Sequence, residues 1–406
     1  MNAEREKKRI YFIDYLRGLL VLYVVFDHAM HPYSPHFKKV HYFGDFGGTL
    51  FFDIWHMHND VIMMPLLYFL AGLFILPSLQ RRGWLSFAKE KFYRLVIPFV
   101  LGTALLVPPQ KYISNMLKHN IDQGFFDYWA NTFFFSDISS SGFWFLYYLA
   151  VLTLLLVTVH TFIPSFMRVM GSFAKWLVNN PFKGFISFFM LGALIIGVSE
   201  MIWGAQYWIG FWKVFYIRGA RFLMKGFLFF LGAGFAYAGI SKNQDVLTRI
   251  GNSWKSWSIL AVLSGTAYIS FALINFYEGA YSTEILRHFH FGGTWADVWP
   301  VIQAYGGPIF MRTTLLALFM CSLIVMYISL FRHFLDKPLP KWQSLAACSF
   351  GIYIFHEPLV MWIGSLFYHA DISEYIKFGV VASLGTALSW ALTHFIKDWP
   401  GFKKVL

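Results

Sequence analysis

The sequence predicts an all-α polytopic membrane protein, a bundle of about ten transmembrane helices with both termini in the cytoplasm. Hydrophobic residues make up 57% of the chain, charged residues only 13%, and mean hydropathy is +0.53. Because a soluble domain carries about 25% charged residues, this chain has too few charges to cover a water-facing surface. The aromatic share of 21% also suits a bilayer, since Trp and Tyr gather at its two interfaces.

Ten segments have the roughly 20 mostly apolar residues that a helical crossing requires. They run near residues 11–30, 59–79, 95–112, 143–163, 184–203, 222–240, 257–276, 313–331, 345–366 and 376–396. The intervening loops are short, so residues 1–406 are expected to form one integral membrane domain. Asp14 and Arg17 interrupt the first apolar segment and no small-residue cleavage site follows His28, so an uncleaved first span is expected.

The distribution of positive charge indicates the orientation. With a cytoplasmic N-terminus, the inner segments hold 21 of the 33 Lys and Arg residues, whereas the outer segments and outer span halves hold 11. This excess agrees with the positive-inside rule. It also accounts for the net charge of +12, so nucleic acid is not an expected partner. The sequence has no clear internal repeat, which weakens the case for a transporter built from inverted halves.

The first span carries a stripe of polar residues. Arg17 and His28 are eleven residues apart, which is almost three helical turns, so both lie on one face about 16 Å apart along the axis. Asp14 falls close to the same face, and Asp27 does not. One interpretation is a structural Asp14–Arg17 pair with an interfacial His28. The other is an enclosed site in which His28 is a general base and Arg17 holds an anion.

A basic segment joins the second and third spans. It ends in Lys91 and Arg94, which are three residues apart and expected on one helical face. The whole group is Arg81, Arg82, Lys89, Lys91 and Arg94. It fits positive-inside topology with lipid phosphate contacts, and equally a phosphate site for a nucleotide-like donor.

Two further groups of polar residues have open interpretations. In the ninth span His356 and Glu357 precede Pro358, which is expected to kink or break the helix. They indicate either a packed histidine with a local hydrogen bond or further polar groups in the same cavity. The outer segments 31–58 and 278–300 are rich in His and aromatic residues, which would suit a sugar or an interfacial belt. Their histidine spacings come with no carboxylate or cysteine motif, so no metal is expected.

Five stretches, taken in order, resemble acyltransferase family 3, whose members move acyl groups onto sugars at the cell envelope. They are YFIDYLRGLLVLYVVFDH, MMPLLYFLAGLF, KFYRLVIPF, GFWFLYYLAVL and CSFGIYIFHEPLV. The resemblance covers essentially the whole chain. The chain looks most similar to the branch that succinylates periplasmic glucans.

The resemblance implies roles for particular residues. The family's arginine–ten residues–histidine motif falls on Arg17 and His28, and its histidine is the proposed catalytic residue. The basic pair before the third span falls on Lys91 and Arg94, where Lys replaces the first Arg and loses bidentate geometry. The late motif falls on Ser349 to His356.

The implied activity is transfer of an acetyl or succinyl group from cytoplasmic acyl-CoA to a hydroxyl of an extracytoplasmic glycan, at a bacterial inner membrane. Arg81 and Arg82 are expected to help Lys91 and Arg94 bind the donor phosphates, and no permanently bound cofactor is expected. Arg218 or Arg221 would suit a succinyl carboxylate or an ordinary structural role. The competing interpretation is a transporter or flippase for a glycolipid or small anion, with the polar stripe as its path.

Overall fold

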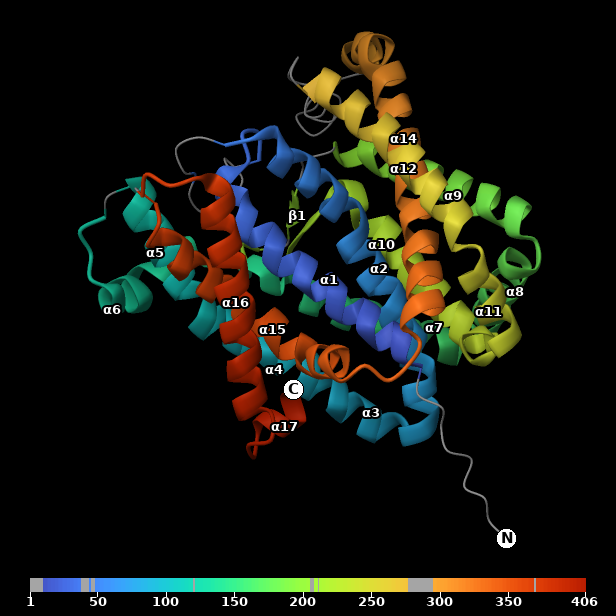
Figure 1. The fold of residues 1–406 in the computed structure, drawn as a ribbon, viewed down its shortest axis with the longest axis horizontal. Coiled ribbons are helices and arrows are strands. Elements are labelled where there is room, and N and C mark those ends of the chain that lie inside the picture. Colours follow the sequence, from blue (N-terminus) through green and yellow to red (C-terminus); the bar gives the residue numbers. More distant parts are fainter. Residues whose placement is uncertain are drawn as a thin grey trace.

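The computed structural model describes residues 10–37, 44, 48–119, 121–204, 208–210, 212–276, 295–368 and 370–406. Within these residues the chain is mostly helical (Figure 1). The basic N-terminal residues, His41 and residues 278–294 of the second outer segment lie outside the described part.

The elements of the first half begin with α1 and end with α8. They are α1 (Tyr11–Met30), η1 (His31–Tyr33), α2 (Leu50–Arg82), α3 (Trp84–Lys91), η3 (Phe92–Val96), α4 (Ile97–Leu101), η4 (Gly102–Leu106), α5 (Val107–His119), α6 (Phe125–Asp127), η5 (Tyr128–Asp137), η6 (Ser141–Phe143), α7 (Trp144–Phe162) and α8 (Pro164–Asn179).

The second half contains the two described strands. Its elements are α9 (Pro181–Trp203), β1 (Trp208–Gly210), β2 (Tyr216–Arg218), α10 (Gly219–Tyr237), η7 (Ile240–Lys242), α11 (Gln244–Asn252), α12 (Trp254–Phe276), α14 (Trp295–Leu335), α15 (Pro340–Ser365), α16 (Glu374–Ile396) and α17 (Phe402–Val405).

Nine helical stretches of the described part are long and apolar enough to cross a membrane, and they cover nine of the ten predicted segments. The tenth is α1, which is a continuous 20-residue helix that carries Asp14, Arg17 and Asp27. α1 runs through the middle of the bundle, in contact with α15, α16, α2 and α14 (Figure 1). An all-α membrane protein is therefore the correct class.

Three local expectations need correction. β1 and β2 form a short antiparallel hairpin, which the all-α prediction did not include. Pro358 lies inside the continuous helix α15, so it does not break that helix. The third predicted span is interrupted by two π-helical turns, η3 and η4, which lie just before Pro98 and Pro108 respectively. Proline offers no N–H to the preceding turn, and a wider turn accommodates that lost hydrogen bond.

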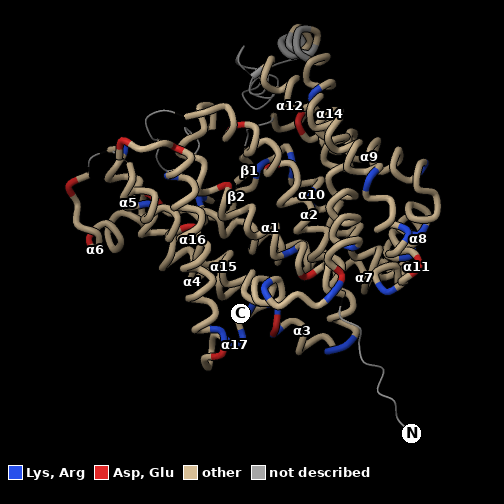
Figure 2. Tube along the Cα trace, viewed as in Figure 1, with Lys and Arg blue, Asp and Glu red and all other residues tan. Residues whose placement is uncertain are grey.

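Several contacts join segments, or the helix ends beside them, that the charge pattern predicts on the same side of the membrane. Segments predicted to be inside contact one another through Phe12–Asp336, Arg332–Gln244, Arg249–Val178 and Lys404–Tyr93. Segments predicted to be outside do the same through Lys213–Ser136 and Arg218–Asp60. Figure 2 shows Lys and Arg on α3, α17, α11 and α8 along the lower and right-hand part of the molecule.

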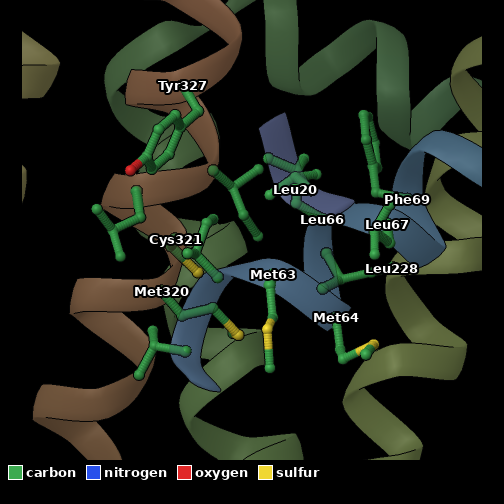
Figure 3. Close-up of a cluster of buried hydrophobic side chains, with 14 of the residues drawn as sticks. Leu20, Met63, Met64, Leu66, Leu67, Phe69, Leu228, Met320, Cys321 and Tyr327 are labelled. Atoms are coloured by element: carbon green, nitrogen blue, oxygen red, sulfur yellow. The ribbon is translucent and has the colours of Figure 1, made fainter. Parts of the chain in front are cut away.

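The main apolar core lies where α1, α2, α10 and α14 meet (Figure 3). Many of its members are leucine and methionine side chains that are nearly inaccessible. Figure 3 labels Leu20, Met63, Met64, Leu66, Leu67, Phe69, Leu228, Met320, Cys321 and Tyr327. This core fixes the helices whose outer halves carry the polar groups described below.

Helices α2 and α10 touch backbone to backbone at two glycines. A Cβ on Gly72 would collide with the carbonyl oxygen of Phe229, and a Cβ on Gly232 would collide with that of Phe69. Small residues permit this close approach, which gains van der Waals contact where lipid supplies no hydrophobic driving force. The two helices therefore have a fixed separation.

We expect Gly72→Ala to destabilise the protein by about 1–3 kcal/mol, because the added methyl group would force α2 and α10 apart. Gly379→Ala in α16 is the matched control, since a Cβ there meets nothing within 4 Å. The measurement is the thermal unfolding midpoint in detergent, followed by tryptophan fluorescence. Equal midpoints for the two variants would contradict this packing.

Candidate functional site

Helix α15 lies along α1 and supplies partners to both ends of the polar stripe. At the inner end, Arg17 Nε donates to Ser349 Oγ at 3.3 Å, and its Nη2 donates to the Ala346 carbonyl at 3.3 Å. Arg17 Nη2 also lies 3.5 Å from Asp14 Oδ1. Because both partners of the guanidinium on α15 belong to one turn, they fix the register between the two helices at this end.

At the outer end of the stripe, His28 faces His356 and Glu357. The ring centroids of His28 and His356 are 5.2 Å apart, and His28 Nδ1 lies 3.9 Å from Glu357 Oε1. The His28 side chain is 21% exposed and that of Glu357 is 4% exposed. The His28 ring therefore lies beside a nearly inaccessible carboxylate.

Glu357 is held by residues that the sequence analysis did not single out. Its Oε1 accepts a hydrogen bond from Ser141 Oγ at 2.6 Å, and its Oε2 accepts one from the Gly142 N–H at 3.0 Å. Tyr353 Oη donates to the Gly142 carbonyl at 2.6 Å, which ties the same turn to α15. A Cβ on Gly142 would lie 2.6 Å from Glu357 Oε2, so only glycine leaves room for the carboxylate.

His356 has a defined tautomer. Its Nδ1 lies 2.7 Å from the Tyr353 carbonyl, which can only accept, so Nδ1 carries the proton. His356 Nε2 is then an acceptor, and within the described residues this buried atom has no hydrogen-bond partner. The side chain is 1% exposed. A buried acceptor that faces His28 is suited to receive a hydrogen bond from a bound hydroxyl.

Asp27 lies off the stripe, as its position in the sequence predicts, and faces α2. Its Oδ1 accepts a hydrogen bond from His56 Nδ1 at 3.0 Å, and its Oδ2 lies 3.9 Å from His31 Nε2. Burial lowers the pKa of His31 to about 3, although Asp27 opposes the shift. His31 is therefore a neutral imidazole near pH 7.

The predicted donor-binding residues occupy the junction of α2, α3 and η3. Glu90 lies among them, with Oε2 2.9 Å from Arg82 Nη1 and Oε1 3.7 Å from Arg94 Nη1. Lys91 Nζ lies 5.3 Å from the centre of the Phe87 ring. Arg81 is exposed at the end of α2. The predicted common face of Lys91 and Arg94 is altered, because η3 begins at Phe92 and its wider turns change the angle between successive side chains.

An open groove runs beside α1, between that helix, α15 and α16. Its volume is about 500 Å³, and its lining includes Leu22, Phe26, Lys341, Ser344 and Trp390. Lys341 lies at the end predicted to face the cytoplasm, whereas Phe26 lies half a turn before His28. The groove thus extends along α1 from the predicted inner side toward the outer polar centre.

A second buried charged group joins α2 to the start of α10. Asp60 forms ion pairs with Arg221 and, at 3.3 Å, with Arg218. Burial lowers the pKa of the Arg218 guanidinium, and Asp60 opposes this shift. Lys225, 6% exposed, has no hydrogen bond or ion pair in the described part, and its ammonium lies 4.3 Å from the centre of the Trp144 ring. The group therefore holds more positive than negative charge.

Residues 10–394 match the family described as the acyltransferase domain, the acyltransferase 3 family. The chain belongs to this family. No curated protein and no solved structure matches the chain. The membership assigns acyltransferase activity to a helical membrane protein, and it places the whole polar stripe of α1 within the acyltransferase domain.

Among the site residues of this acyltransferase, the hydrogen bond from Ser141 to Glu357 is the most readily tested. Ser141→Ala is expected to cost about 1.5–3 kcal/mol, because the buried carboxylate loses a hydrogen-bond donor. Ser136→Ala is the control, since its exposed hydroxyl donates only to the Thr132 carbonyl, and its effect should stay within about 0.5 kcal/mol. Thermal unfolding midpoints in detergent provide the comparison, and similar losses in both variants would remove Ser141 from the site.

Proposed function

We propose that the protein is an O-acyltransferase that moves an acetyl or succinyl group from cytoplasmic acyl-CoA to a hydroxyl of an extracytoplasmic glycan. The observation that carries this proposal is the polar centre around His28, where an imidazole faces the Glu357 carboxylate and the acceptor Nε2 of His356. Such a centre can remove a proton from a hydroxyl near neutral pH.

We place both termini in the cytoplasm and α1 across the bilayer, at a bacterial inner membrane. The contacts among the inner segments and among the outer segments support this arrangement, as does the positive-inside bias. A charged span is costly in lipid, but α1 is covered by neighbouring helices and its charges have partners. His28 then lies in the outer half of the bundle, within reach of an extracytoplasmic sugar.

In the proposed reaction His28 is the general base. It takes the proton of the sugar hydroxyl as the hydroxyl oxygen attacks the thioester carbonyl, and the C–S bond then breaks to release CoA thiolate. The imidazolium faces Glu357, which stabilises its charge as the acidic member of a catalytic triad does. The proton then passes to the thiolate. The alternative mechanism has two steps: the acyl group would first move to His28 as an acyl-enzyme intermediate and then to the sugar hydroxyl.

The donor would bind at the cytoplasmic face and extend along α1. Lys91 and Arg94, with Arg81 and Arg82, would hold its phosphates. The groove beside α1 would accept the pantetheine arm, since it runs from Lys341 toward the turn that carries His28. Arg17 lies at the predicted inner end of α1, where it would position the donor or bind a negative group.

The acyl group is the least determined part of the proposal. Arg218, Arg221 and Lys225 outnumber the one carboxylate of Asp60 among them. Buried basic side chains attract an anion, so an anionic acyl group such as succinyl would be stabilised there. This supports the glucan succinyltransferase branch over an acetyltransferase, and comparison of the two donors decides between them.

Purified protein in nanodiscs is expected to release CoA thiol from one donor when a periplasmic glucan is added. His28→Ala should reduce this acceptor-dependent release at least about 100-fold, the contribution typical of general base catalysis. His394→Ala on α16, a histidine stacked on Trp390, is the matched control and should retain activity.

Near-normal turnover of His28→Ala would refute its role as base. A transporter or flippase would release no thiol with acetyl-CoA or succinyl-CoA, even in the presence of acceptor. Calorimetric titration of each donor then separates a transporter, which would bind no acyl-CoA, from an enzyme that lacks its correct acceptor.

Arg94→Ala is expected to raise the donor KM about 3–10-fold and leave the acceptor KM unchanged, because a partly exposed charge contributes modestly to phosphate binding. Glu90→Gln removes the carboxylate that competes for Arg94 and Arg82, so the donor KM should stay equal or fall. Arg168→Ala, another exposed arginine on the predicted inner side, is the control. A change confined to the acceptor KM would place the donor elsewhere.

A further inference from the structure

Asp27, His31 and His56 bring three potential metal-ligand atoms together at the outer end of α1. One carboxylate oxygen and one nitrogen of each imidazole lie within 4.8 Å of one another. Asp27 comes from α1, His31 from η1 and His56 from α2, so three elements converge on one point. Asp27 is 3% exposed, and each imidazole side chain is 12% exposed.

This donor set has the chemistry of a zinc site. Two imidazoles and one carboxylate form a common catalytic zinc site, with the fourth position open. In a tetrahedral site with Zn–N and Zn–O bonds of about 2.1 Å, two ligand atoms lie about 3.4 Å apart. Because the three donor atoms lie within 4.8 Å of one another, the widest separation needs to close by at most about 1.4 Å when an ion binds.

We propose that Asp27, His31 and His56 bind one divalent metal ion, Zn²⁺ by the chemistry of the donors. Asn59, 0% exposed, lies with its Nδ2 3.5 Å from Asp27 Oδ1, where it orients the carboxylate. Such outer partners are a regular feature of metal sites.

The nearby pair of His36 and Asp53 is an ordinary carboxylate–histidine contact, with which the cluster of three metal-ligand residues can be compared. His36 Nδ1 lies 2.5 Å from Asp53 Oδ2, and Asp53 is further held by Ser34 Oγ and the His36 N–H. Among the described residues this pair belongs to no group of three metal-ligand side chains, and the Asp53 carboxylate accepts from local donors. Around Asp27 a second imidazole is present instead, with ring centroids of His31 and His56 4.7 Å apart.

The metal would lie beside the proposed general base. Asp27 and His28 are consecutive, and the rings of His28 and His31 are 6.1 Å apart. An ion with one open position would bind a water molecule or an acceptor hydroxyl and lower its pKa, next to the imidazole that takes the proton. The metal site is nevertheless defined by its ligands alone, so its test does not depend on acyl transfer.

The test measures metal content by mass spectrometry, on protein purified through a tag without histidine and then dialysed with Zn²⁺. We expect about one Zn²⁺ per chain in the wild type, and less than about 0.2 in Asp27→Asn and in His56→Ala, because loss of one of three ligands removes most of the affinity. His394→Ala on α16, a histidine stacked on Trp390, is the control and should retain zinc.

Two other results would contradict the proposed metal site. Wild-type protein that elutes as a folded species with no zinc would overturn the proposal, as would zinc that persists in Asp27→Asn. If the ligand variants do not fold, wild-type protein is stripped with chelator and titrated with Zn²⁺ by calorimetry, where no saturable binding contradicts the proposal. His28→Ala should keep its zinc while it loses transfer, which separates this inference from the proposed function.

Discussion

The fold depends on the need to satisfy charged groups within α1, an otherwise apolar helix in the middle of the bundle. The polar side chains of α1 have partners on α15, on α2 and, for Asp14, within α1 itself. Arg17 and His28 face α15, and Asp27 faces α2. Because a charge in lipid is expensive unless it is paired or faces the bundle interior, these pairs determine which helices surround α1 and in which rotation. The apolar core supplies van der Waals contact, which depends little on direction and therefore does little to set the rotation of α1.

The sequence predicted the parts of the structure that are periodic. Apolar runs of about 20 residues identified nine helices, and the eleven-residue spacing placed Arg17 and His28 on one face of α1. It also placed Asp27 on another face. The residues that surround His28 could not be predicted in the same way. Glu357 faces His28 and is held by Ser141, which is 216 residues away in the sequence, and no local pattern joins the two. Only tertiary packing brings them together.

The sequence did not predict three local features. The third predicted span alternates α and π turns near Pro98 and Pro108, so the angle between Lys91 and Arg94 differs from that in a regular α-helix. Glu90 bridges Arg82 and Arg94. The sequence does not predict this role, because a count of Lys and Arg residues takes no account of an acidic residue among them. The half-buried Pro358 is accommodated within the continuous helix α15.

Two polar centres share one helix turn at the outer end of α1, and this placement has a consequence for both. Asp27 and His28 project from consecutive residues, so the carboxylate that holds His56 and the imidazole that faces Glu357 cannot move independently. Any shift of α1 that improved one centre would disturb the other. The backbone contact between α2 and α10 and the Arg17 hydrogen bonds to α15 restrict such shifts. Rigid helices therefore provide at this end the preorganisation that His28 would require as the proposed base.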